Sequence, residues 1–248
     1  MRLKSPTQVF RMDGKNCFAE VLCSSLGIDK IAINFLTYDA SQNKGNRETG
    51  HITIYIDIFE ARVLAGDILN GSISALKGKE MKRVFAGPDL PENKGRTVYP
   101  KPIYELVGGT CAEHTVDHKP ICRQFQIAPG TKQPWTLTAT SGPGKTVGNG
   151  LIVPNGRPAT VIRIGLDDKT LKMFAYALET CASIWSQAKF LPVVEPVMAE
   201  VRVQIQRTVN ELVSQKKQEA PSEDAMYDDS GIPDSPVFHR SFPDKFPY

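Results

Sequence analysis

The sequence contains no long hydrophobic run, and no apolar stretch approaches the ~20 residues that a membrane-spanning helix needs. No hydrophobic segment follows residues 1–4, so we expect no secretory signal and no membrane association. Cysteine is scarce, and its odd number, five, favours a reducing compartment in which the thiols are free or bound to metal. Together these absences predict an intracellular protein, either cytoplasmic or nucleoid-associated.

The sequence also lacks a recognisable catalytic set. No Ser-His-Asp or Cys-His arrangement emerges from spacing, and carboxylates such as Asp57 and Asp167 stand at predicted helix starts, where capping explains them. Residues 139–146 have the loose spacing of a phosphate-binding loop, but the glycines and prolines that follow exclude the helix which that motif requires. We therefore expect no enzyme activity, and we expect residues 141–150 to form a flexible loop with Lys145 at its tip.

Two segments predict a β-strand that runs directly into an amphipathic helix. In residues 159–189 a β-branched strand precedes apolar residues at steps of three, four and seven. About 108 residues earlier, alternating isoleucines at 52–58 precede a helical pattern at 59–77. The sequence therefore predicts a duplication, with matching residues in the two copies: Ile54, Ile56 and Val63 align with Ile162, Ile164 and Leu171.

Further alternating segments predict the remaining strands. They lie at 30–39, 104–107, 123–128 and 135–140, whereas residues 1–16 show no clear period. A basic, glycine- and proline-rich connection is expected between 77 and 104. The predicted fold class is α+β, with two tandem antiparallel β-sheet-plus-helix repeats at residues 1–78 and 79–190, a C-terminal helix at 193–218 and a disordered acidic tail at 219–248.

Charge is distributed unevenly along the chain. The formal net charge is +3, but residues 219–248 hold seven acidic and two basic side chains, which leaves a net charge of +8 on the rest. A basic body with an acidic tail indicates a polyanionic partner for the body. An ordinary surface with a solubilising tail explains the same numbers without such a partner.

The predicted helix at 193–218 has a narrow apolar stripe and is otherwise polar. Val197, Val201, Ile205, Val209 and Leu212 make up this stripe. Such a helix either packs on the body or pairs with another copy of the chain to give a homo-oligomer.

The most specific local pattern is C-x2-H-x3-H-x3-C, formed by Cys111, His114, His118 and Cys122. Thiolate and imidazole are the ligands that tetrahedral zinc prefers, and a closed set of four predicts a structural zinc site. The compact spacing resembles that of a zinc knuckle, with His in place of the second Cys. The alternative is a polar hairpin loop in which these residues cluster without a metal.

Aromatic and basic residues alternate along the predicted strands and loops. Bases stack on aromatic rings while cations follow the phosphates, so this pattern is typical of binding to single strands without sequence preference. Strands are also rich in aromatic residues that belong to the core, which is the alternative. The predicted contacts with DNA are Tyr55, Arg123, Lys132, Trp135, Lys145 and Arg163.

Strands at 30–39 and 52–58 before one helix, and at 123–128, 135–140 and 160–166 before a second, resemble the Whirly and positive-cofactor-four family of single-stranded DNA-binding proteins. The resemblance covers residues 28–190, and it implies that an exposed sheet face and its loops hold DNA in replication, recombination or mobile-element biology.

A second resemblance lies in the tail. Its acidic residues and terminal aromatic residues resemble the tails with which bacterial and phage single-stranded DNA-binding proteins recruit replication or repair proteins. Two other functions stay open from the sequence: a structural or assembly protein acting through its C-terminal helix and tail, and an enzyme whose site the sequence does not reveal.

Overall fold

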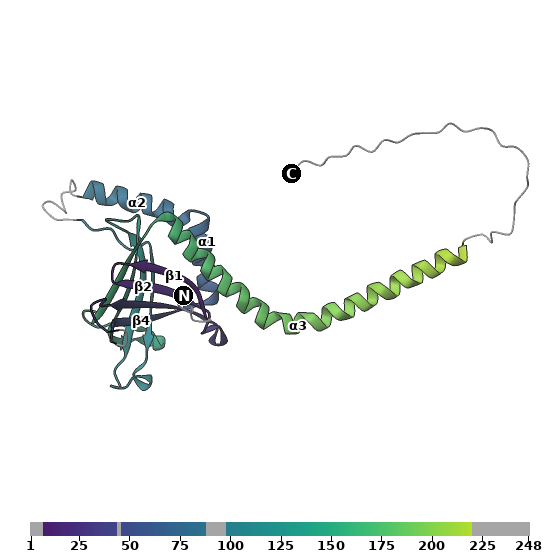
Figure 1. Cartoon of the computed structure of the whole chain (residues 1–248), viewed down its shortest axis with the longest axis horizontal. Helices are drawn as coiled ribbons and strands as arrows, with labels where there is room; N and C mark the ends of the chain where they lie inside the picture. The colour runs from purple at the N-terminus through teal and green to yellow at the C-terminus, as the bar shows by residue number, and fades with distance from the viewer. Residues whose placement is uncertain (1–6, 44–45, 88–97, 220–248) are drawn as a thin grey trace, which may run out of the picture. The chain divides into compact units, whose positions relative to one another are not determined.

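The protein has an α+β fold with two antiparallel sheets and a long C-terminal helix, which confirms the predicted class (Figure 1). The computed structural model describes residues 7–43, 46–87 and 98–219. The chain divides into two units, Met1–Val193 and Val194–Tyr248. The predicted disordered tail, except for Glu219, lies outside the described residues.

The first repeat is a four-stranded meander followed by two helices. Its strands pair in the order β1-β2-β3-β4, and β1 falls where the sequence shows no clear period. Core-facing residues alternate along β3 and β4, so that Ile33 lies opposite Ile54 and Phe35 opposite Ile52, all at most 3% exposed. The elements are β1 (Gln8–Gly14), β2 (Cys17–Leu22), β3 (Lys30–Tyr38), β4 (Glu48–Asp57), α1 (Ile58–Leu69) and α2 (Ser72–Ala86), with a 3-10 turn, η1 (Leu26–Ile28), before β3.

The first helical region is broken into two helices, where the sequence predicted one helix at 59–77. Gly71 has a φ of 86°, a left-handed conformation that glycine adopts without steric cost and that ends α1. The Asn70 side chain then accepts a hydrogen bond from the Ser72 amide and starts α2. Residues 77–86 therefore belong to a helix, and the predicted basic connection begins ten residues later than expected.

The second repeat has the same order of strands with one addition. In it β5, β6, β7 and β9 pair in succession, while β8 pairs with the far end of β7. Lys145 lies opposite Val153 in that extra hairpin, so most of the predicted glycine-rich loop is a strand. The elements are β5 (Tyr104–Thr110), η4 (Ala112–His114), β6 (Ile121–Pro129), β7 (Trp135–Thr146), η5 (Gly148–Gly150), β8 (Ile152–Pro154), β9 (Thr160–Leu166) and α3 (Asp168–Glu219).

The two repeats share one hydrophobic core. In Figure 1 the purple strands of the first sheet run across the teal strands of the second, and a single buried cluster joins both sheets, α1 and the first turns of α3. The Trp185 indole N–H of α3 donates to the Asp29 carboxylate at 2.7 Å, and the Lys189 ammonium donates to the same carboxylate at 2.9 Å. Trp185 and Lys189 of the second repeat thus both bond to Asp29 of the first repeat.

The repeats correspond at an offset of 110 residues, not 108. Asp57 and Asp167 occupy equivalent positions, and each carboxylate accepts an amide N–H in the first turn of α1 or α3. At this offset the buried residues Ala61, Leu64 and Ile68 of α1 match buried residues of α3, whereas Val63, which the 108-residue alignment places opposite buried Leu171, is 66% exposed. The equivalent buried pairs are Ile52 and Ile162, Ile54 and Ile164, Ala61 and Leu171, Leu64 and Phe174, and Ile68 and Leu178.

Helix α3 (Asp168–Glu219) is one helix where the sequence predicted two, at 167–189 and 193–218. One face of its first part, from Leu171 to Trp185, is buried in the core, and its described residues after 194 leave their apolar side chains exposed. None of the helices in the described ranges is long and apolar enough to cross a membrane.

Candidate nucleic-acid interface

A cleft of about 240 Å³ lies where the two sheets meet at their end strands, β4 and β5. Tyr55 reaches it because core-facing residues alternate along β4, and Ile54 and Ile56 take the inward positions. The Tyr55 side chain is 53% exposed. The cleft is lined by Lys30, Thr53, Ile54, Tyr55, Leu106, Gly108, Gly109, Thr110 and Arg123.

Arg123 of β6 is the unpaired cation of this cleft. Its guanidinium donates to the Thr110 hydroxyl at 2.7 Å, and no ion pair within 4.0 Å among the described residues involves it. Lys30 differs, because its ammonium lies 3.4 Å from the Asp57 carboxylate that caps α1. The structure thus brings together two of the predicted contacts, Tyr55 and Arg123, which stand in different repeats.

A second aromatic patch lies at the other end of the first sheet, and its cation Arg11 is paired with the carboxylates of Asp13 and Glu20. Arg11 stacks over the Phe18 ring at 3.7 Å from its centroid, and the Phe18 and Tyr38 ring centroids are 6.1 Å apart. Arg47 lines the same 300 Å³ hollow. Neither Phe18 nor Tyr38 is among the DNA contacts that the sequence predicted.

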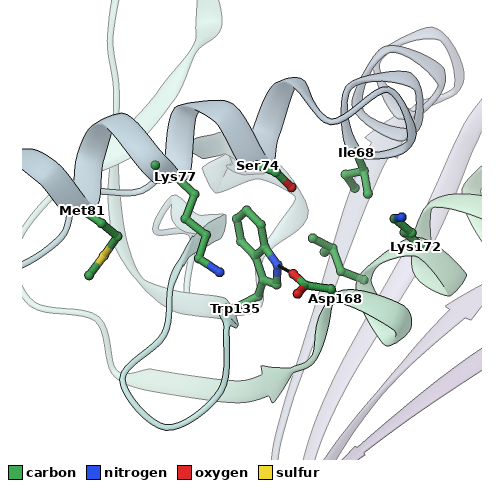
Figure 2. Close-up of a pocket in the computed structure, with 9 residues that line it drawn as sticks. Ile68, Ser74, Lys77, Met81, Trp135, Asp168 and Lys172 are labelled. Carbon is green, nitrogen blue, oxygen red and sulfur yellow. Dashed lines mark hydrogen bonds between the residues drawn. The ribbon is translucent and has the colours of Figure 1, made fainter.

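Trp135 is not available as a stacking surface, which corrects its predicted role. The side chain is fully buried, and its indole N–H donates to the Asp168 carboxylate at 2.7 Å (Figure 2). The Lys77 ammonium of α2 covers the ring at 4.4 Å from the centroid. The adjoining 460 Å³ pocket between α2 and the start of α3 exposes lysine side chains rather than the indole.

The other predicted contacts are exposed but lie apart from one another. Lys132 is in the turn before β7 and Lys145 near its far end, so about 36 Å of extended strand separates the two ends of β7. Arg163 lies opposite Thr138, on the face of the second sheet that is turned away from the core. The cations that the sequence predicted as DNA contacts therefore do not lie together on one surface.

The four-ligand zinc set is not assembled. Cys122 is buried, and its thiol faces the Ile152 carbonyl oxygen at 3.9 Å. Within the described part of the chain, the cluster of metal-binding atoms consists instead of Cys111, His114 and an acidic neighbour, Glu113. Spacing fixed which residues stand near one another in the chain, but not the direction in which each side chain points.

Burial controls the titrating groups near these sites. It raises the pKa of the Tyr104 phenol, whose hydroxyl also donates to the Glu60 carboxylate at 2.9 Å, so the phenol stays protonated. Burial likewise raises the pKa of the Cys17, Cys122 and Cys181 thiols. These three cysteines are therefore poor nucleophiles.

No family model matches the sequence, and a search of curated proteins finds no match either.

Proposed function

We propose that the protein binds single-stranded DNA through the cleft between β4 and β5, largely without sequence preference. The observation that carries this proposal is the cleft itself, which is lined both by Tyr55, a half-exposed aromatic residue, and by Arg123. An exposed ring offers a stacking surface to any base, and a cation without a carboxylate partner is available to a phosphate.

Three further features support the proposal. The body of the chain is basic. Each repeat has an antiparallel sheet whose last strand leads into a helix, and a tandem pair of such strand–helix units is the pattern on which the resemblance to Whirly and positive-cofactor-four proteins rests. Phe18 and Tyr38 lie on the same outer face of the first sheet as Tyr55, about 14 Å and about 20 Å away along the strands, and would give a bound strand a second stacking platform.

Tyr55→Ala tests the stacking surface. The variant should bind a labelled single-stranded oligonucleotide more weakly by ~1–3 kcal/mol, the usual contribution of one stacked base, while Tyr55→Phe should bind like the wild type. Fluorescence anisotropy measures both affinities. Tyr176→Ala is the matched control, because this α3 tyrosine is 62% exposed and does not line the cleft.

Arg123→Gln tests the phosphate contact. Loss of one phosphate contact should reduce the slope of log affinity against log salt by about 0.7 for a single strand. Arg62→Gln on α1 is the control, because that guanidinium pairs with Glu179 and does not line the cleft. Equal affinity for single-stranded and duplex oligonucleotides, or unchanged binding in both Tyr55→Ala and Arg123→Gln, would contradict the proposal.

For the tail, we propose that its acidic residues compete with phosphate for the basic body and that its aromatic end recruits replication or repair proteins. Removal of residues 219–248 should then tighten DNA binding at low salt, and the gain should shrink as salt screens the attraction. The same truncation should abolish partner capture, and capture that persists would contradict recruitment by the tail.

A second candidate function is assembly of several copies through the C-terminal helix. Its residues Val194, Met198, Val201, Ile205 and Leu212 are each more than 40% exposed and recur at steps of four, three, four and seven residues, the spacing of a coiled coil. Sedimentation equilibrium should show an oligomer of the full chain that Ile205→Glu dissociates. Val203→Glu, on the opposite side of the helix, is the control and should leave the oligomer intact.

A further inference from the structure

The loop between β5 and β6 carries metal-binding side chains that the proposed DNA cleft does not use. The Cys111 sulfur, a Glu113 carboxylate oxygen and a His114 ring nitrogen all lie within 4.8 Å of one another. We propose that these three residues bind one zinc ion and leave a fourth coordination position open to solvent.

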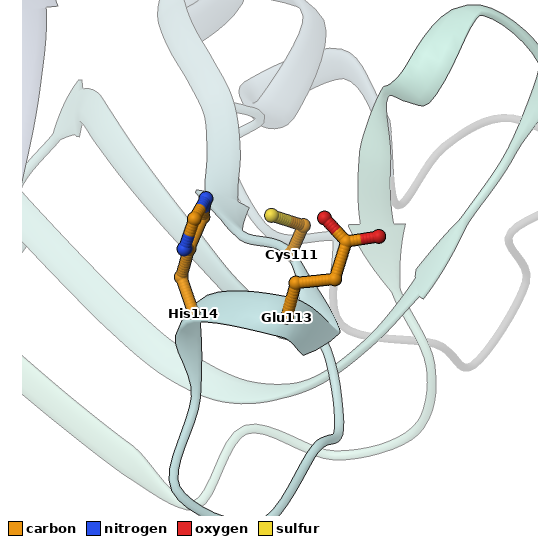
Figure 3. A group of neighbouring side chains, drawn as sticks. All are labelled: Cys111, Glu113 and His114. Carbon is orange, nitrogen blue, oxygen red and sulfur yellow. The ribbon is translucent and has the colours of Figure 1, made fainter.

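Local backbone structure brings the three side chains together. Cys111 is the N-cap of the 3-10 turn η4, and His114 is its last residue. Side chains three residues apart are eclipsed in a 3-10 helix, so the thiol and the imidazole rise from the same side of the turn. Figure 3 shows the sulfur between the imidazole and the Glu113 carboxylate, with all three groups on that side.

The loop that presents this cluster is fixed by its own hydrogen bonds. The Thr115 hydroxyl lies 3.0 Å from the Ala112 carbonyl oxygen and 2.8 Å from that of Lys119, and it accepts the Lys119 amide N–H at 3.0 Å. These contacts tie both ends of the loop to its centre. A loop held in this way loses less conformational entropy when a metal binds.

The ligand set and its spacing favour zinc. Cysteine sulfur, histidine nitrogen and carboxylate oxygen bind zinc at about 2.0–2.3 Å, which places the ligands of a tetrahedral site roughly 3.5 Å apart. The three ligand atoms now lie within 4.8 Å of one another, so each side chain has to move by about 1 Å to bind one zinc ion. Glu113 and His114 are exposed, and Cys111 is half-buried. Three protein ligands at an exposed turn leave the fourth position accessible to water or to another ligand.

Two ligand sets now make opposite predictions. The set derived from sequence spacing includes His118 and Cys122, whereas the set that the structure brings together includes Glu113 and excludes both. Cys122 is 4% exposed, and its sulfur lies against the Ile152 carbonyl oxygen, so the thiol would have to leave a packed position to reach an ion in the loop.

Zinc titration of the full chain, stripped of metal and measured in competition with a chromogenic chelator, tests the site. The wild type should bind one zinc per chain. Cys111→Ser and His114→Ala should each weaken zinc binding by more than ~10-fold. Substitution of a residue that only hydrogen-bonds to a metal ligand already costs ~10–100-fold, and loss of a ligand should cost no less. Cys122→Ser and His118→Ala are the matched controls and should bind zinc as the wild type does. Circular dichroism checks that each variant folds.

Cobalt supplies a second readout that does not depend on affinity. Cobalt bound to a thiolate has a sulfur-to-metal charge-transfer band, which should be present in the wild type and in Glu113→Gln and absent in Cys111→Ser. Less than half a zinc per chain in the wild type would overturn the proposal. So would a loss of zinc in the control variants equal to that in Cys111→Ser, or an unchanged zinc affinity in Glu113→Gln.

Discussion

Replacement of Trp135 by phenylalanine should destabilise the protein without weakening DNA binding. Phenylalanine keeps most of the ring that fills the core but removes the indole N–H that donates to Asp168 at 2.7 Å. A hydrogen bond to a charged group contributes about 1.5–3 kcal/mol. Water can hydrate the exposed Asp168 carboxylate after the loss, so we expect the free energy of unfolding to fall by about 1–2 kcal/mol. Trp135→Ala, which also leaves a cavity, should cost about 3–5 kcal/mol.

Urea unfolding followed by far-ultraviolet circular dichroism measures these losses, because each substitution removes a fluorophore. Trp185→Phe is the matched control, since its indole also donates to an aspartate, Asp29, at 2.7 Å and does not line the proposed DNA cleft. Both variants should bind a single-stranded oligonucleotide like the wild type. A tenfold loss of DNA affinity in Trp135→Phe, with an unchanged free energy of unfolding, would refute the assignment of this side chain to the core.

Three further substitutions or modifications have definite expected outcomes. The Lys189 ammonium lowers the pKa of the Asp29 carboxyl, so Asp29→Asn should destabilise the protein near neutral pH. The difference in unfolding free energy should begin to shrink as pH falls below about 3.9, the pKa of an unfolded aspartate, and should vanish below the lowered pKa of folded Asp29. Burial raises the pKa of the Cys181 thiol to about 12, so mass spectrometry should find it alkylated by iodoacetamide only after denaturation. A Cβ on Gly109 would stand 2.1 Å from a backbone carbonyl oxygen of β6, so Gly109→Ala should destabilise by about 1–3 kcal/mol in urea unfolding. Gly108→Ala, which meets open space, should change stability by less than about 0.5 kcal/mol.

Periodicity predicted most of the fold because the core is built from it. The alternating isoleucines of β4 and β9 and the helical stripe at the start of α3 all face inward. The same alternation explains the error in the repeat offset. A strand pattern of period two matches itself after a shift of two residues, whereas a helix shifted by two presents a different face, as exposed Val63 shows. The caps Asp57 and Asp167 would have given the correct offset.

The candidate site was less accessible to sequence reasoning. Tyr55 and Arg123 stand in different repeats, and only the meeting of the two end strands places them in one cleft. The alternation of apolar residues along β7 places Trp135 on the same face of the sheet as Leu137. It does not show whether a helix covers that face or whether a ligand can reach it. In the β5–β6 loop, Cys111 and His114 follow the eclipsed geometry of a 3-10 turn, which a count of residues between ligands does not show.

The single core shared by the two repeats has a consequence for how the chain folds. Neither repeat can bury its own sheet face, since the inward side chains of each sheet pack against the other sheet and against α3. The body should therefore unfold in one cooperative transition, with the calorimetric enthalpy equal to the van't Hoff enthalpy. When only the first repeat has left the ribosome, the isoleucines on the inner face of its sheet are exposed to water. We therefore expect this part of the nascent chain to aggregate unless synthesis reaches the end of α3 or a chaperone binds it.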